Sequence, residues 1–151
     1  MKILKILGVV LAAFLALIVI LFMVRVTKDI AKTNDIVDAI NKSDKVVLIM
    51  SGNHDDTKTV EVTDKADIDK LKKLCTSIGG VDWYNDSICG HFPNHSVRFI
   101  NTSENTEIIV CPAADGCNSY EIEDNLYNIA ETTRKEFDKT VKKYGMTFPY
   151  V

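Results

Sequence analysis

Residues 96–129 read SVRFINTSENTEIIVCPAADGCNSYEIEDNLYNI, and this stretch decides the fold. Three runs are strand-like, Ser96–Asn101, Thr106–Cys111 and Cys117–Glu123, and apolar and polar residues alternate over Tyr120–Glu123. A shorter apolar run follows near Leu126–Ile129. Alternation with a period of two is typical of β-strands that bury one face, and the polar or Gly/Pro-containing segments between the runs are typical of tight turns. The sequence therefore predicts a series of antiparallel strands.

Two further strands and two helices are predicted on either side of this stretch. Val46–Met50 is a continuous apolar run, and Thr57–Thr63 alternates, so we expect a hairpin. Apolar residues recur every three to four positions after Asp64 and again over Glu131–Tyr144, which predicts two amphipathic helices. An antiparallel sheet with both helices packed on one face accounts for this order, so the predicted fold class is α+β.

A membrane-spanning helix is predicted at the N-terminus. Ile6–Val24 reads ILGVVLAAFLALIVILFMV, 19 residues without a polar side chain. At about 1.5 Å rise per residue, such a helix nearly spans the roughly 30 Å hydrocarbon core of a bilayer. The alternative is a cleaved secretory signal, whose apolar region is shorter and ends in small residues. Arg25-Val26-Thr27-Lys28 follows this run instead, so we expect an uncleaved anchor over residues 1–25.

The segment between anchor and domain is predicted to be a juxtamembrane stalk over residues 26–45, with the domain over 46–151. It contains DIVDAIN at 35–41, which is either a short helix of its own or an extension of the membrane helix. The basic residues flanking the anchor are balanced, with Lys2 and Lys5 on one side and Arg25, Lys28 and Lys32 on the other. Because a short charged tail before a first span usually stays in place, we expect a single-pass protein with its N-terminus inside and its domain outside.

Small residues line one face of the predicted anchor. Gly8, Ala12 and Ala16 are four residues apart and therefore lie on one side of a helix. This spacing lets two membrane helices approach closely, and it would allow self-association through that face. The alternative is that such residues are simply common in membrane spans.

The charge of the chain favours some partners and disfavours others. Three basic residues and no acidic ones fall within residues 1–25, so the rest of the chain holds 15 basic and 21 acidic groups. This balance disfavours nucleic acid, which needs a basic surface. Seven acidic residues and no lysine or arginine lie between Arg98 and Arg134, and strand alternation places Glu107, Glu121 and Glu123 on the open face of the sheet. We expect these three residues to attract a cationic protein, unless the basic last helix balances them.

The order of elements resembles that of small, uncharacterised, membrane-anchored or lipoprotein α+β domains of Gram-positive bacteria. The resemblance covers about residues 44–145 and includes DKADIDKLKKL at 64–74, RKEFDKTVKKYG at 134–145 and CPAADGC at 111–117. A membrane anchor stands where these proteins often carry a lipid-modified cysteine. The resemblance implies the fold and a location at the cell surface, and it implies no activity.

All four cysteines follow the anchor, which favours disulfides if the domain is exported. Cys111 and Cys117 flank a five-residue turn between two predicted strands, so we expect a Cys111–Cys117 disulfide. Cys75–Cys89 then follows by elimination, although Cys75 lies on the buried side of a helix and could be a free thiol. The competing connectivity is Cys89–Cys117, because the segment around residues 85–95 could cover the same hairpin.

The chain carries no recognisable catalytic signature, and we expect neither an enzyme nor a cofactor. It contains no nucleophile elbow, zinc-protease helix, phosphate-binding glycine loop or calcium loop. The predicted function is therefore that of a membrane-anchored interaction domain, with a role in sensing, inhibition, immunity or assembly. The alternative is a metal- or thiol-handling protein that uses Cys89, His91 and His95, whose C-x-H-x₃-H spacing could hold zinc with a fourth ligand.

Overall fold

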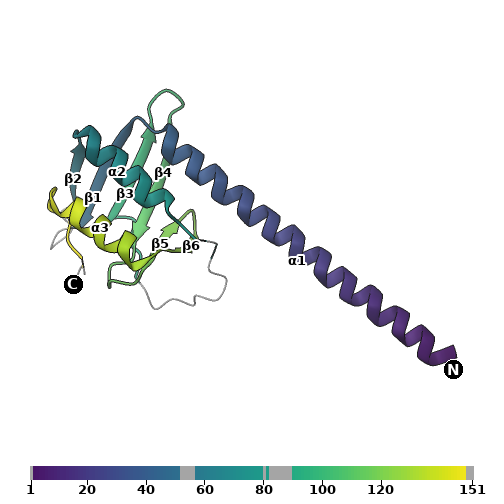
Figure 1. The fold of residues 1–151 in the computed structure, drawn as a ribbon. Coiled ribbons are helices and arrows are strands. Elements are labelled where there is room, and N and C mark those ends of the chain that lie inside the picture. Colours follow the sequence, from purple (N-terminus) through teal and green to yellow (C-terminus); the bar gives the residue numbers. More distant parts are fainter. Residues whose placement is uncertain (1, 52–56, 80, 82–89, 149–151) are drawn as a thin grey trace. The chain divides into compact units, whose positions relative to one another are not determined.

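A computed structural model of the chain describes residues 2–51, 57–79, 81 and 90–148. This part contains a long N-terminal apolar helix, a six-stranded antiparallel sheet and two further helices (Figure 1). The α+β fold class predicted from the sequence is therefore confirmed. The chain divides into two compact units, residues 1–34 and residues 35–151, which are described separately below.

The first unit is formed by most of helix α1 (Lys2–Lys42). From Val10 to Val24, the large apolar side chains of α1 are 46–61% exposed. A continuous apolar surface of this kind is unfavourable in water and favourable in lipid. Within the described residues, α1 is the one helix long and apolar enough to cross a membrane, and an 18-residue window within it has a mean hydropathy of 2.7. It is therefore a candidate membrane anchor.

The last turns of α1 belong to the domain. Helix α1 continues without a break to Lys42, so the segment at 35–41 extends the long helix and is not a separate short one. The second unit begins at Asp35, and Ile36 and Ile40 are 1% and 0% exposed within its core. Lys72 Nζ donates hydrogen bonds to the carbonyl oxygens of Asn41 (3.1 Å) and Ser43, where a cation stabilises the helix C-terminus. Part of the predicted stalk is thus part of the folded domain.

The sheet has the spatial order β2-β1-β3-β4-β5-β6, and every neighbouring pair is antiparallel. Consecutive strands form the β1–β2 hairpin and the β3 to β6 meander, as the turn signals in the sequence predict. The strands are β1 (Lys45–Ser51), β2 (Thr57–Val62), β3 (Ser96–Asn101), β4 (Thr106–Pro112), β5 (Ser119–Ile122) and β6 (Asn125–Asn128).

Helices α2 (Lys65–Thr76) and α3 (Glu131–Lys142) cover one face of the sheet (Figure 1). The side chain of Asp64 caps α2 by accepting a hydrogen bond from the backbone N–H of Asp67 at 3.0 Å. The carboxylate of Asp67 in turn accepts hydrogen bonds from Lys143 Nζ (2.7 Å) and the Tyr144 hydroxyl (2.9 Å), which ties α2 to the end of α3. The largest buried side chains between helices and sheet are Tyr120, Tyr127, Phe99, Phe137, Leu48, Leu71 and Ile122.

Candidate binding face

The candidate site lies on the face of the sheet opposite α2 and α3. Along β4, Ile108 and Val110 contribute to the core, so the alternating residues Glu107, Ile109 and Cys111 lie on the other face. On β5, Tyr120 and Ile122 are fully buried, which places Glu121 on the same outer face. The β4–β5 register sets Cys111 directly opposite Glu121.

The turn between β5 and β6 adds two more carboxylates. Glu123 and Asp124 connect the strands and have φ values of 48° and 60°, in the left-handed region. Two consecutive positive φ values are typical of the primed turns that match the twist of a tight hairpin. Glycine, asparagine and aspartate occupy such turns most readily, so Glu123 is the unusual residue there.

These residues line one pocket of about 270 Å³, which we call the carboxylate pocket. The three glutamates singled out by the sequence, Glu107, Glu121 and Glu123, are brought together there. The other lining residues, Pro93, Ile109 and Cys111, are uncharged, so the pocket combines carboxylates with an apolar floor. The lining residues are Pro93, Glu107, Ile109, Cys111, Glu121, Glu123 and Asp124.

Two of the carboxylates have a basic neighbour. Arg98 Nη1 lies 3.3 Å from Glu107 Oε1, with both side chains about one-third exposed. His91 Nδ1 lies 3.7 Å from Glu121 Oε2, and His91 Nε2 is 3.2 Å from the hydroxyl of Ser119. Among the residues that the structure describes, four carboxylates line the pocket, and one arginine and one histidine lie at its margin.

Cys111 is a free, buried thiol, and the predicted Cys111–Cys117 disulfide is wrong. The prediction assumed that Cys117 lies within a strand directly opposite Cys111. In the structure β5 begins at Ser119, and Glu121 occupies the position opposite Cys111. Burial raises the pKa of the Cys111 thiol to about 11, to which Glu121 contributes while Arg98 opposes the rise. The thiol is therefore protonated at neutral pH and is a poor nucleophile.

Cys75 is also a free thiol, so the predicted Cys75–Cys89 pairing is wrong as well. Its side chain is fully buried on the inner side of α2, where it fills core space. Burial strongly raises the pKa of the Cys75 thiol. Cys89 lies outside the described residues.

The two histidines of the metal alternative contact different parts of the domain. His91 contacts Ser119 and Glu121 at the sheet face. His95 is 3% exposed and packs edge-on against the ring of Phe148, with ring centroids 4.9 Å apart. Burial lowers the pKa of His95, a hydrogen bond with the backbone of Thr147 opposes this, and nearby Arg134 adds to the lowering. No group of three His, Cys, Asp or Glu residues with metal-binding geometry occurs within the described ranges.

Arg134 on α3 holds the turn that precedes β5, a role that the sequence analysis did not identify. Its guanidinium donates to the backbone oxygens of Cys117 (2.6 Å, Nη1) and Ala113 (2.8 Å, Nη2) and to Asp138 Oδ1 (2.8 Å, Nε). It also lies 4.6 Å above the centre of the Phe148 ring. The backbone N–H of Ala114 donates to the carbonyl oxygen of Gly90 at 2.7 Å. The turn between β4 and β5 is thus held by Arg134 of α3 and by the backbone of Gly90.

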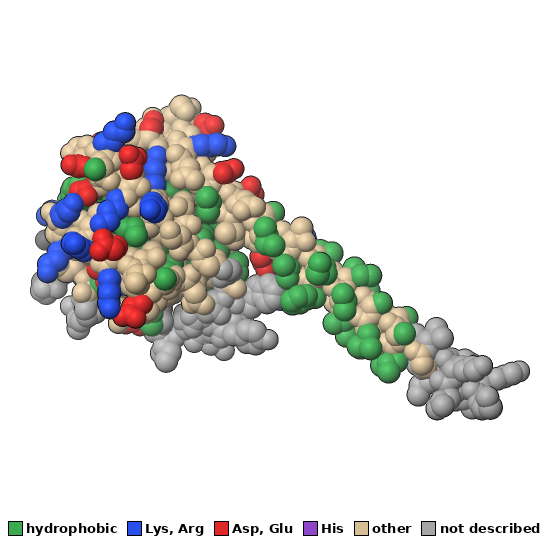
Figure 2. Space-filling view, in the orientation of Figure 1, with side chains coloured by type: hydrophobic (Ala, Val, Ile, Leu, Met, Phe, Trp, Pro, Cys, Tyr) green, Lys and Arg blue, Asp and Glu red, His purple; other side chains and the backbone are tan. Residues whose placement is uncertain are grey.

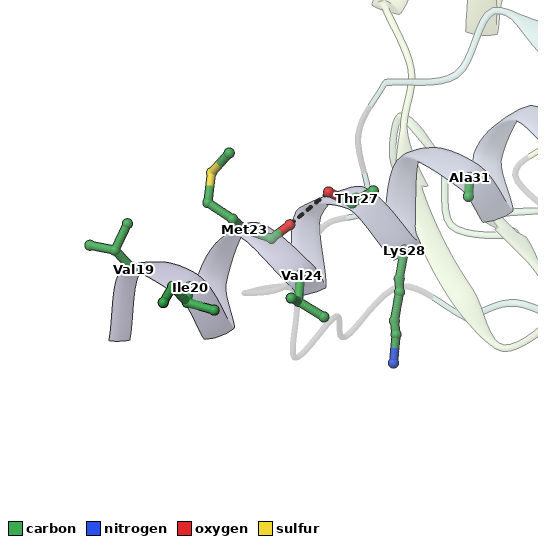
Figure 3. Close-up of a pocket in the computed structure, with 7 residues that line it drawn as sticks. All are labelled: Val19, Ile20, Met23, Val24, Thr27, Lys28 and Ala31. Atoms are coloured by element: carbon green, nitrogen blue, oxygen red, sulfur yellow. Dashed lines mark hydrogen bonds between the residues drawn. The ribbon is translucent and has the colours of Figure 1, made fainter. Parts of the chain in front are cut away.

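The helix of the first unit carries a hollow of about 470 Å³ (Figure 3). All seven of its lining residues come from α1, and Thr27 Oγ1 donates a hydrogen bond to the carbonyl oxygen of Met23 at 2.8 Å within the same helix. Side chains of one helix do not enclose a ligand, so we assign no binding role to this hollow. Gly8, Ala12 and Ala16 are exposed on α1.

The chain was compared with protein-family models, with curated proteins and with solved structures, and none of the three comparisons finds a match.

Proposed function

We propose that this chain is a single-pass membrane protein whose α+β domain lies outside the cytoplasm and binds a cationic protein partner through the carboxylate pocket. The apolar helix α1 supports the membrane anchor. Lys2 and Lys5, which precede the apolar run without an acidic residue, support the orientation, because basic residues beside a span favour the cytoplasmic side.

The carboxylate pocket is the observation that carries this proposal. A volume of about 270 Å³ is at the lower limit for small-molecule sites, so it suits a single side chain better than a larger ligand. Lysine and arginine combine an apolar stem with a charged end. The stem would contact Ile109 and Pro93, while the charged end would reach the carboxylates of Glu121 and Glu123.

The charge of the pocket is expected to act mainly on the rate of association. A hexalysine peptide serves as the probe, and its binding to the full-length protein is followed by stopped-flow fluorescence at low salt. We expect Glu121→Lys combined with Glu123→Lys to slow association by about tenfold, because steering by complementary charge raises on-rates by one to three orders of magnitude. The difference should shrink at high salt, since the Debye length falls from about 30 Å at 0.01 M to about 3 Å at 1 M.

A matched control separates the pocket from net charge. Asp69→Lys combined with Glu104→Lys makes the same change in net charge at two exposed residues that do not line the pocket. This control should retain most of the wild-type rate. If the Glu121/Glu123 variant folds and binds hexalysine at an unchanged rate in low salt, the proposed binding face is wrong.

The orientation has its own test. Protease added to intact cells or spheroplasts should degrade the domain, whereas lysis should be needed to degrade a cytoplasmic control protein. Full protection of the domain in intact cells would contradict the proposed topology.

A further inference from the structure

The two layers of the domain carry opposite net charge. Helices α2 and α3 together hold eight basic and five acidic residues. The described strands and turns, residues 44–51, 57–62 and 90–130, hold three basic and eight acidic residues. Figure 2 looks onto the helical layer, where lysine and arginine side chains are spread over α2 and α3. The acidic carboxylate pocket lies on the opposite face of the sheet.

The ion pairs within the helical layer leave two exposed lysines on α3 unpaired. Lys70 pairs with Glu136 at 2.6 Å, and Lys135 pairs with Glu131 at 2.6 Å. Among the described residues, no carboxylate lies within ion-pair distance of the ammonium group of Lys139 or Lys142. These two lysines line a second pocket of about 420 Å³, the lysine pocket, together with Asp138, Thr147 and Phe148. The carboxylate of Asp138 is already bonded to Arg134.

We infer that the carboxylate pocket of one copy binds the lysine pocket of a second copy, so that the domains associate head to tail. This inference rests on the proposed function, because it names the cationic partner of the same site. One chain provides both complementary surfaces, and it provides them on opposite faces. When two different patches of identical chains bind each other, every copy still has one patch of each kind free for a further copy. Such an interface produces a closed ring if the rotation from copy to copy returns to the first copy, and an open row of domains if it does not.

The size of the surfaces indicates a weak, reversible contact. Twelve residues give a helix of roughly 18 Å, and two adjacent helices are roughly 20 Å wide, so the helical layer offers roughly 360 Å². The total buried area of roughly 700 Å² is below the 1,200–2,000 Å² of stable complexes. Confinement of anchored copies to one membrane raises their effective concentration, which would make such a contact effective.

Energy transfer between copies tests this inference. Full-length protein labelled separately with donor and acceptor is reconstituted together in phosphatidylcholine vesicles. We expect transfer at about 10 mM salt that is largely lost at roughly 300 mM, because the Debye length falls several-fold over this range. Association through the membrane helices would persist at high salt, since screening acts on exposed charges.

Charge reversal on each surface provides the decisive control. One variant carries Glu121→Lys, Glu123→Lys and Asp124→Lys, and the other carries Lys139→Glu and Lys142→Glu. Each variant alone should lose the salt-sensitive transfer, because it then presents like charges on both surfaces. Mixing the two variants should restore transfer, because the reversed surfaces complement each other.

Three outcomes would overturn the inference. These are the absence of salt-sensitive transfer in the wild-type protein, the failure of the mixed variants to restore it, and a requirement of transfer for anionic phosphatidylglycerol in the vesicles. The last result would identify an anionic membrane surface, not a second copy, as the partner of the lysine pocket. If hexalysine still binds the carboxylate pocket in any of these cases, the proposed function stands. If neither hexalysine nor a second copy binds, both proposals fail.

Discussion

Replacement of Arg134 by methionine should destabilise the domain more than any other single change to a charged residue of α3. Arg134 is 3% exposed and donates three hydrogen bonds, two of them to backbone carbonyls of the turn before β5. Methionine retains much of the apolar stem but none of the donors. The change therefore tests the hydrogen bonds of the guanidinium more than its packing.

The expected loss follows from the groups left without a donor. The carbonyl of the fully buried Ala113 loses its bond with Arg134, which costs about 1–3 kcal/mol for a buried, unsatisfied acceptor. The carbonyl of Cys117 is partly exposed, and water replaces part of its bond, so we assign it about 1 kcal/mol. The side chain of Asp138 is 35% exposed, which limits its share to about 1 kcal/mol. The sum is about 4 kcal/mol, within the usual range for removing one partner of a buried ion pair.

The assay is urea unfolding of the full-length protein in detergent, followed by the fluorescence of its single tryptophan. Lys139→Met on the same helix is the matched control, and as an exposed residue it should change stability by less than about 0.5 kcal/mol. Burial raises the pKa of Asp138, and Arg134 opposes the rise. Without Arg134, the carboxylate of Asp138 loses this favourable partner, and Asp138→Asn removes that charge. In the Asp138→Asn background, Arg134→Met should therefore lower the free energy of unfolding by about 1 kcal/mol less. A loss below about 1 kcal/mol for Arg134→Met, or unchanged hydrogen exchange across residues 113–118, would refute this account of the turn.

Three further predictions concern pH, the β5–β6 turn and the cysteines. Burial lowers the pKa of His95 below its ordinary value of 6.5, so the unfolded chain takes up the proton first as the pH falls. The free energy of unfolding should therefore decrease as the pH drops below 6.5. His95→Gln should make this decrease smaller in unfolding curves measured at several pH values. Glu123→Asn with Asp124→Gly suits the positive φ values of the turn, so it should raise stability by about 1 kcal/mol while weakening hexalysine binding, and a less stable variant would contradict this. Because the other two cysteines are free, we expect peptide mapping without reductant to find a Cys89–Cys117 link, whereas four free thiols would exclude it.

Local patterns were sufficient to predict most of the fold. The strand at Ser96–Asn101 has the predicted bounds, and the last helix begins at Glu131 as expected. Strand alternation and helical periodicity depend on near neighbours, so they are present in the sequence itself. The outer-face position of Glu107 and Glu121 follows from the same alternation, and this part of the candidate site could be predicted before the structure was known.

Contacts between distant residues could not be predicted in this way. Ile36 and Ile40 belong to the core, although they follow the membrane helix and precede every strand. An apolar stripe on a helix predicts that another element packs against it, but it does not identify that element. Helix α2 ends at Thr76, and three residues further on the N–H of Gly79 donates to the carbonyl of Asn128 at 2.8 Å. An added Cβ at Gly79 would lie 3.1 Å from that oxygen, so the glycine permits a close approach to β6.

The cysteine prediction failed for a reason that also explains how the pocket forms. Two strand residues that flank a short turn are opposed only if the turn is centred midway between them, and the sequence 111–117 offers no sign of where that centre lies. In the structure Cys111 pairs with Glu121 and Pro112 pairs with Tyr120, so the turn is centred near Gly116 and not near Ala114. Arg134, which lies on α3, holds the carbonyls of Ala113 and Cys117 within this turn. This register leaves Cys111 as a buried thiol beneath the carboxylates, and an intact Cys111–Cys117 bond would have removed the floor of the pocket.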